Sequence, residues 1–416
     1  METLALYGGS PVRKLPFPDR GSMGAHERTA VNALFDYAAE NGGSIGYGGA
    51  EEDSYCKEFS EYMGGGYADA VNSGTSAVYI ALRALEIEPF TEVIAGPLTD
   101  PGGLMPIPLN NLIPVIADAA HGSYNTDAAQ IEKMITPLTR AVIVTHIGGE
   151  PADIENIMAL AKKHGLFVIE DCAQAHHARL NGRLAGTFGD IAAFSTMYGK
   201  HHCTGGQGGI VFTRNEDAYW KIRRASDRGK PFGLPEGATN CMAALNFNSN
   251  ELACCIGRVQ LRKLPGIVEA RRKAVAFAEA SVRHLHAVSA PELLPGAEPS
   301  YWFWRLKYNR GYLSCDKETY CDALRAEGMQ VNPSYTAAMP QLMNWFVERR
   351  VFGKSGYPWS APEYKGDREK RFPCPNAIKA VQDHFNVTVH EGYTMEDMKD
   401  VIHIFEKVER KRRTPV

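Results

Sequence analysis

The feature that most constrains the fold is a regular alternation of short apolar runs with helical patterns between about residues 65 and 215. Several runs are apolar throughout, which is typical of strands buried on both faces of a mostly parallel sheet. The segment after Pro151 instead spaces its apolar residues like one face of a helix, at Ile154, Ile157, Met158 and Ala161. This alternation predicts an α/β domain. We expect its strands at Ala68–Val71, Glu92–Ala95, Ile113–Ala117, Ala141–His146, Leu166–Glu170, Ile191–Ser195 and Gly209–Thr213.

A second, smaller domain is predicted downstream. A long helical pattern follows Pro265, and the proline- and glycine-containing stretch 292–299 is typical of a hinge. Beyond it we expect a strand at Tyr301–Tyr308 and helices at Lys317–Glu327 and Met395–Val408. The stretch 340–375 is dense in proline and aromatic residues, and a substrate lid, an oligomer contact and a surface insertion all fit it. The predicted division is an N-terminal arm at 1–25, a large domain at 26–288 and a small α+β domain at 289–416.

Composition excludes several classes of protein. A net charge of -3 gives no long-range attraction to nucleic acid or anionic lipid, so we interpret the basic run Arg410–Arg413 as a solvated helix end. No apolar run is long enough to span a bilayer, and the first residues lack the parts of a secretory signal. The 9 cysteines are scattered without a Cys-x-x-Cys pair, which favours a reduced, cytoplasmic protein. The histidine pairs 176–177 and 201–202 lack carboxylates at ligand spacing, so we expect no metal site.

The most informative motif runs from Phe194 to Gly209 and sets Lys200 between a serine and a series of glycines. Upstream, an apolar run ends in Glu170 and Asp171. A lysine that can form an imine, an acid at the end of a buried strand and small residues around a phosphate are what a pyridoxal 5′-phosphate (PLP) enzyme needs. The small and polar neighbours of Lys200 would admit an aldehyde, and the alternative is an ordinary loop lysine.

Further residues fit the other needs of that cofactor. Asp171 would keep the pyridine nitrogen protonated, although an ion-paired or capping aspartate has the same pattern. The amide of Gln174 could touch the ring or its hydroxyl group. At Asn72–Ala77 a helix begins with small hydroxyl residues, where free backbone N–H groups can bind an anion, unless this is only an N-cap. Ser195 could add a further phosphate donor.

With these motifs, the chain resembles the DegT/StrS-type sugar aminotransferases, which are PLP enzymes of fold type I. The resemblance includes the opening 4–13, the turn Ser73-Gly74-Thr75, and the segments 124–127, 146–153, 170–176 and 189–209. It implies that Lys200 holds the cofactor, that Asp171 faces the ring nitrogen and that Gln174 contacts the ring. It also implies phosphate contacts from Gly74, Thr75 and Ser195, and from Asn246 across the interface of a homodimer.

Three positions depart from the family pattern. Asp100 stands where an aromatic residue usually stacks on the ring, Asn248 replaces an arginine, and Gln207 replaces an acid. Some family members carry histidine at the lysine position and act as sugar dehydratases. In this chain the position is occupied by Lys200, so the resemblance favours transamination over dehydration.

The predicted function is therefore that of a PLP-dependent aminotransferase. It would move an amino group from glutamate or glutamine to a keto-sugar or keto-cyclitol, in amino-sugar or antibiotic biosynthesis. The alternatives are a PLP-dependent dehydration or other PLP reaction, and a PLP-binding regulatory protein without turnover. We expect neither nucleic acid nor a membrane among its partners.

Overall fold

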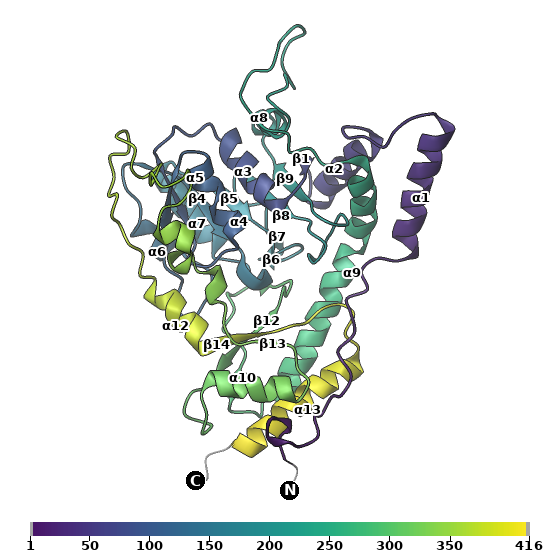
Figure 1. Cartoon of the computed structure of the whole chain (residues 1–416), viewed down its shortest axis with the longest axis vertical. Helices are drawn as coiled ribbons and strands as arrows, with labels where there is room; N and C mark the ends of the chain where they lie inside the picture. Colours follow the sequence, from purple (N-terminus) through teal and green to yellow (C-terminus); the bar gives the residue numbers. More distant parts are fainter. Residues whose placement is uncertain (1–2, 413–416) are drawn as a thin grey trace.

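A seven-stranded sheet forms the centre of the large domain (Figure 1). The computed structural model describes residues 3–412, and their side chains up to residue 410. The strand order is β1-β9-β8-β5-β4-β2-β3. Every strand expected for the large domain is present, with ends shifted by at most two residues: β1 (Tyr67–Val71), β2 (Glu92–Ala95), β3 (Ile113–Ile116), β4 (Thr139–Thr145), β5 (Phe167–Asp171), β8 (Ile191–Ser195) and β9 (Gly209–Thr213).

The sheet is mixed but mostly parallel, as predicted. β9 pairs antiparallel with both β1 and β8, whereas β2, β3, β4, β5 and β8 pair in parallel. All residues of β2, β3, β8 and β9 are buried, which explains why these strands are mainly apolar, with polar residues only at their ends. The carboxyl ends of the parallel strands therefore meet at one edge of the sheet, where open α/β sheets bind ligands.

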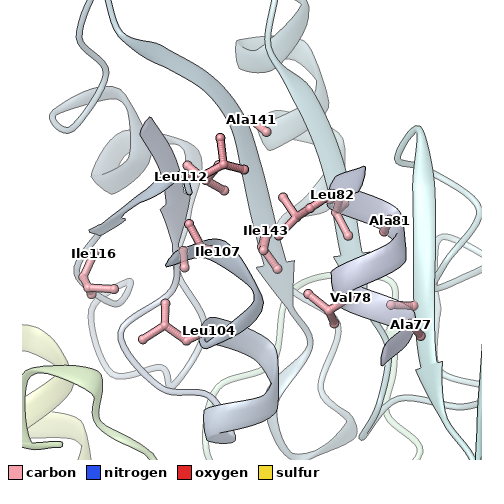
Figure 2. Close-up of a cluster of buried hydrophobic side chains, with 14 of the residues drawn as sticks. Ala77, Val78, Ala81, Leu82, Leu104, Ile107, Leu112, Ile116, Ala141 and Ile143 are labelled. Atoms are coloured by element: carbon pink, nitrogen blue, oxygen red, sulfur yellow. The ribbon is translucent and has the colours of Figure 1, made fainter. Parts of the chain in front are cut away.

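Helices cover the sheet with apolar faces. On α7 (Ile154–His164) the buried positions are Ile154, Ile157, Leu160 and Ala161, and Gly165 ends the helix with a φ of 64°. On α3 (Gly74–Ala84), Val78 and Leu82 point towards Ile143 of the sheet and the neighbouring Leu104 (Figure 2). Each such buried side chain contributes roughly 1.5–3 kcal/mol, so the cluster holds α3 firmly against the strand ends.

The long helix α9 (Glu251–Val282) differs from the sequence prediction, which had it begin after Pro265. It begins at Glu251, directly after the N-cap residue Asn250, whose side chain accepts a hydrogen bond from the backbone N–H of Ala253 at 2.9 Å. A proline inside a helix removes one backbone hydrogen bond and costs about 3 kcal/mol, which is why a boundary was expected there. Burial on both sides of the proline outweighs that cost, at Leu261, Leu264, Ile267 and Val268.

A second, antiparallel sheet forms the small α+β domain, in the order β10-β12-β14-β13. Its core also takes in Leu4 and Phe17 of the arm and Val275 of α9. The exact domain boundaries stay a prediction. The elements are β10 (Val288–Ser289), β12 (Trp304–Tyr308), β13 (Val331–Asn332), β14 (His384–Val387), α10 (Lys317–Ala326), α12 (Pro375–Asp383) and α13 (Met395–Arg412).

The segment 340–375 packs against the core of the large domain. Phe346, Trp359 and Tyr364 belong to that core, and the Tyr364 hydroxyl donates to Glu92 Oε1 at 2.9 Å. The remaining helices are η1 (Ala5–Tyr7), α1 (Ala25–Glu40), α2 (Ala50–Tyr62), α4 (Pro101–Leu104), α5 (Pro106–Leu109), α6 (Ala128–Glu132), η2 (Ile147–Gly149), α8 (Glu216–Ser226), η3 (Thr336–Ala338), η4 (Pro340–Leu342) and α11 (Asn344–Val347). The short strands are β6 (Arg179–Leu180), β7 (Arg183–Leu184) and β11 (Ala297–Glu298).

Two expectations concern the chain as a whole. Within residues 3–412, no helix combines the length and the apolar character that crossing a membrane requires. The basic run 410–413 falls mainly outside the described side chains, so its interpretation as a solvated helix end stays a prediction.

Candidate active site

Three parallel strands bring polar side chains to the same edge of the sheet. Asp171 and Ser195 are the last residues of β5 and β8, and Asp100 follows the end of β2. A cavity of about 250 Å³ opens at this edge and is lined by all three of these residues and by Lys200. Gly74 and Thr75 at the start of α3 complete one wall. The structure thus brings five of the predicted cofactor-binding residues to one cavity, together with Asp100 and Gln207, two of the positions that depart from the family pattern.

Lys200 lies in the turn after β8 and is 9% exposed. Its Nζ approaches the ring centroid of Trp302 to 4.4 Å. Burial lowers the pKa of the Lys200 amine, and the nearby carboxylates of Asp171 and Asp100 partly oppose that shift. A lowered pKa increases the fraction of neutral amine, which is the form that attacks an aldehyde.

The backbone of this turn is held from the N-terminal arm. Arg20 donates hydrogen bonds to the carbonyl oxygen of Lys200 and, at 2.8 Å, to that of His201. The same guanidinium pairs with Glu391 of the small domain. The lysine turn is therefore fixed by residues that lie far apart in the sequence.

Asp171 is a buried carboxylate whose negative charge has few hydrogen-bond partners within the protein. Its Oδ1 accepts a hydrogen bond from the backbone N–H of Ala173 at 3.0 Å. Burial raises the pKa of Asp171, and the charge of Lys200 only partly offsets this. A protonated ring nitrogen against this carboxylate would supply the positive partner that a buried charge requires.

The preceding residue, Glu170, is held very differently. Its carboxylate accepts four hydrogen bonds, from His146 Nε2 at 3.1 Å and from the backbone N–H groups of Gly186, Phe188 and Gly189 at 2.8, 2.7 and 2.7 Å. Burial alone would raise the pKa of Glu170, but these hydrogen bonds lower it below its ordinary value. Glu170 is therefore satisfied within the protein.

His146, Glu170 and Cys172 place potential ligand atoms within 4.8 Å of one another. His146 Nδ1 accepts from the backbone N–H of Ala152 at 3.0 Å, so its Nε2 carries the proton that it donates to Glu170. Burial raises the pKa of the Cys172 thiol well above its ordinary value, which disfavours the thiolate that a metal needs. We therefore assign this cluster a structural role.

The start of α3 has the properties of an anion site. Ser73 caps the helix by accepting from the backbone N–H of Ser76 at 3.0 Å. The backbone N–H groups of Gly74 and Thr75 have no acceptor among residues 3–412, as expected for the first turn of a helix. A Cβ on Gly74 would lie 2.6 Å from Ser195 Cβ, so only glycine lets the helix start approach the end of β8 this closely. These residues fit the phosphate group of PLP.

One wall of the cavity carries Asp100 in the place where the family usually has an aromatic residue. Asp100 Oδ1 accepts from the backbone N–H of Gly102 at 2.9 Å and begins the short helix α4. A Cβ on Gly103 would lie 2.7 Å from Asp171 Oδ2, so glycine allows the α4 backbone to approach the carboxylate. Gly102, Gly103 and Ala173 line the cavity without having been singled out in the sequence. The two adjacent glycines after Asp100-Pro101 were the sequence signal that could have indicated a close backbone approach to the cavity.

Two predicted residues do not line this cavity among the described side chains. Gln174 Oε1 accepts from the backbone N–H of Gly148 at 2.8 Å, and its Nε2 donates to the Tyr335 hydroxyl at 3.1 Å. Asn246 is exposed, and its Oδ1 accepts from Asn248 Nδ2 at 2.8 Å. Asn246 lies in the segment between α8 and α9, and it forms an isolated β-bridge with Asp227, the residue that follows α8. Part of this segment projects from the body of the molecule at the top of Figure 1.

The fold and this cavity define a protein of the PLP-dependent fold-type-I class. The chain belongs to the DegT/DnrJ/EryC1/StrS aminotransferase family, whose profile matches residues 31–406. The family resemblance seen in the sequence is thereby confirmed, and PLP is the cofactor of this family.

Individual relatives extend this finding. A putative L-glutamine:3-amino-2,3-dideoxy-scyllo-inosose aminotransferase from Streptomyces kanamyceticus is 33% identical over 259 residues, which cover 62% of this chain and 61% of that protein. The spore coat polysaccharide biosynthesis protein SpsC from Bacillus subtilis is 31% identical over 369 residues, or 85% of this chain and 88% of that protein. The X-ray structure of an aminotransferase from Psychrobacter cryohalolentis superposes with a TM-score of 0.81 at 25% identity, covering 95% of this chain and 100% of that one.

Proposed function

We propose that this protein is a PLP-dependent aminotransferase that moves an amino group from glutamate or glutamine to a keto-sugar or keto-cyclitol. The observation that carries the proposal is the single cavity that joins Lys200, Asp171 and the start of α3. Relatives support the acceptor class: besides the inosose aminotransferase, a UDP-N-acetyl-3-dehydro-alpha-D-glucosamine 3-aminotransferase from Acidithiobacillus ferrooxidans is 38% identical over 232 residues. Amino-sugar or antibiotic biosynthesis is the setting that we infer.

Each residue has a defined part in this proposal. When bound, PLP supplies an electron sink for the bond that breaks at the substrate carbon. The Lys200 amine would hold the cofactor aldehyde until the amine of the donor displaces it. The freed amine would then take the proton from the donor α-carbon as general base and deliver it, as general acid, to the former aldehyde carbon of the cofactor. Asp171 keeps a proton on the ring nitrogen. The first N–H groups of α3 and the Ser195 hydroxyl bind the phosphate, and Gln174 stays a predicted ring contact.

A homodimer with shared sites belongs to the same proposal. The exposed position of Asn246, which does not line the cavity of its own subunit, supports a phosphate contact to a second copy of the chain. A cytoplasmic location is supported by the nine cysteines, all of which are free thiols.

The proposal is tested on purified protein loaded with PLP. Adding glutamate or glutamine should bleach the absorbance band of the lysine-bound cofactor and release the matching 2-oxo acid. Lys200→Ala should still bind PLP but should abolish turnover. Wild-type turnover in that variant would refute the role of Lys200.

A second candidate keeps the cofactor and changes the reaction to a dehydration or another PLP reaction. Asp100 favours it, because this acid lines the cavity in place of an aromatic ring. Release of a 2-oxo acid from the donor separates the two candidates. A protein that binds PLP but releases no product with any donor would instead support the regulatory alternative.

A further inference from the structure

A second cavity, of about 350 Å³, borders the lysine turn. Gly199, the neighbour of Lys200, lines it, and so does Trp302. The Trp302 ring is the group that Lys200 Nζ approaches at 4.4 Å. The cavity is thus in contact with the aromatic ring next to the amine, yet none of the reasoning above uses it.

The cavity wall carries an excess of positive charge. Arg20 and Arg271 both line the cavity, and both pair with the single carboxylate of Glu391. Another lining residue, His390, does not add to the charge, because burial lowers its pKa and favours the neutral ring. Two guanidinium groups against one carboxylate leave one positive charge uncompensated.

These guanidinium groups also retain hydrogen-bond donors. Arg20 directs three of its nitrogens to Glu391 and to the carbonyl oxygens of Lys200 and His201. Arg271 directs its three to Glu391 and to the carbonyl oxygen of Tyr301. Because a guanidinium has five N–H groups, each arginine can still donate to a ligand.

An unpaired amide lies on the same cavity. Asn386 belongs to β14, is 4% exposed and lines the cavity. Its Oδ1 has no hydrogen-bond partner among residues 3–412. A buried polar atom without a partner is costly, and an amide can rotate to present either its oxygen or its N–H groups at that place. The position therefore suits a polar ligand group.

We propose that this cavity holds a carboxylate of the amino donor, bound by the uncompensated charge of Arg20 and Arg271 and by the amide of Asn386. This inference rests on the proposed function, and it makes Asn386 a residue that sets donor affinity. Trp302 and Tyr335 supply apolar walls for the carbon chain of the donor. The carboxylate can be the one on the α-carbon or the distal one of glutamate.

Asn386→Asp tests the inference on the PLP-loaded protein, because it sets a second negative charge against the donor carboxylate. The Kd for the donor, measured by titrating the bleaching of the cofactor band, should rise at least about tenfold. The matched control is Asn344→Asp, which makes the same charge change at an exposed site on α11 and should bind donors like the wild type. Circular dichroism checks that both variants fold. If Asn386→Asp does not fold, Asn386→Ala replaces it, and its affinity for the donor should be several-fold weaker than that of the wild type.

The choice of donor identifies the carboxylate. Equal weakening for glutamine and glutamate assigns the cavity to the α-carboxylate, and weakening for glutamate alone assigns it to the distal one. Donor affinities within about twofold of wild type in a folded Asn386 variant would overturn the inference. If wild-type protein itself never bleaches with either donor, the proposed function fails instead, so the two failures are distinct.

Discussion

Glu170 and Asp171 are neighbours at the end of β5, and both are buried carboxylates, yet their surroundings are opposite. Successive strand residues point to opposite faces of a sheet, so each side chain meets a different environment. Within residues 3–412, the Glu170 carboxylate accepts four hydrogen bonds and the Asp171 carboxylate accepts one. The pKa of Glu170 is lowered by its hydrogen bonds, whereas burial raises that of Asp171.

The contrast separates a structural acid from an acid reserved for a ligand. A buried charge that is fully hydrogen-bonded is tolerated within the fold, and removing a partner from it is costly. A buried charge left short of partners costs stability in the empty protein and is compensated only when a cation arrives. Matched amide substitutions at the two positions should therefore have opposite consequences.

The largest effect is expected for Asp171→Asn on catalysis. The amide no longer favours a proton on the ring nitrogen, so kcat should fall by about 10²- to 10³-fold, as for loss of an electrostatic catalytic group. Steady-state kinetics at saturating PLP measure this, with thermal unfolding as the check that the fold is intact. Full activity in a folded variant would break the contrast.

Glu170→Gln should instead act on stability. The glutamine places an N–H₂ group among backbone N–H donors, and the variant should lose about 3 kcal/mol in free energy of unfolding. Urea denaturation of the PLP-free protein measures the loss. A stability equal to wild type would show that the four hydrogen bonds do not hold this residue in the way described.

Gly103→Ala tests how closely the wall of the cavity approaches Asp171. Its Cβ would lie 2.7 Å from Asp171 Oδ2 and 2.3 Å from Thr99 Oγ1, so one of these side chains must move. We expect a loss of about 1–3 kcal/mol in stability and a PLP Kd raised about tenfold. Gly46→Ala is the control, because a Cβ there meets nothing within 4 Å. If the two variants had the same stability and the same PLP Kd, the close approach of the Gly103 backbone to Asp171 would be contradicted.

The smallest effect concerns pH. In the PLP-free protein, burial holds the pKa of Asp171 above the ordinary 3.8, so the unfolded chain loses this proton first as the pH rises. The residue then opposes folding at neutral pH, and the penalty is absent below about pH 3.8. Asp171→Asn should thus stabilise the PLP-free protein by about 1 kcal/mol at pH 7 and leave it unchanged near pH 3. If Asp171→Asn were less stable than the wild type at pH 7, the ionised Asp171 would stabilise the PLP-free protein and not oppose its folding.

The sequence was most informative where chemistry and chain position coincide. Lys200 follows one buried apolar strand and Asp171 ends another, so the pattern of those strands predicted that both residues lie at the same edge of the sheet. Pro265 was misleading, because local propensity does not reveal the burial that carries α9 through it. Asn386 could not be singled out either, since its proposed role depends on the cavity that it shares with Arg20 and Arg271, and only tertiary packing brings these residues to one cavity.

The contacts of Arg20 have a mechanical consequence. The Arg20 side chain donates hydrogen bonds to the carbonyl oxygens of Lys200 and His201, and it pairs with the carboxylate of Glu391 in the small domain. A rotation of the small domain would accordingly pull the turn along with it rather than slide past it. The Lys200 turn and Glu391 of the small domain would then move together. Such a rotation would therefore leave the position of the Lys200 amine relative to Glu391 unchanged.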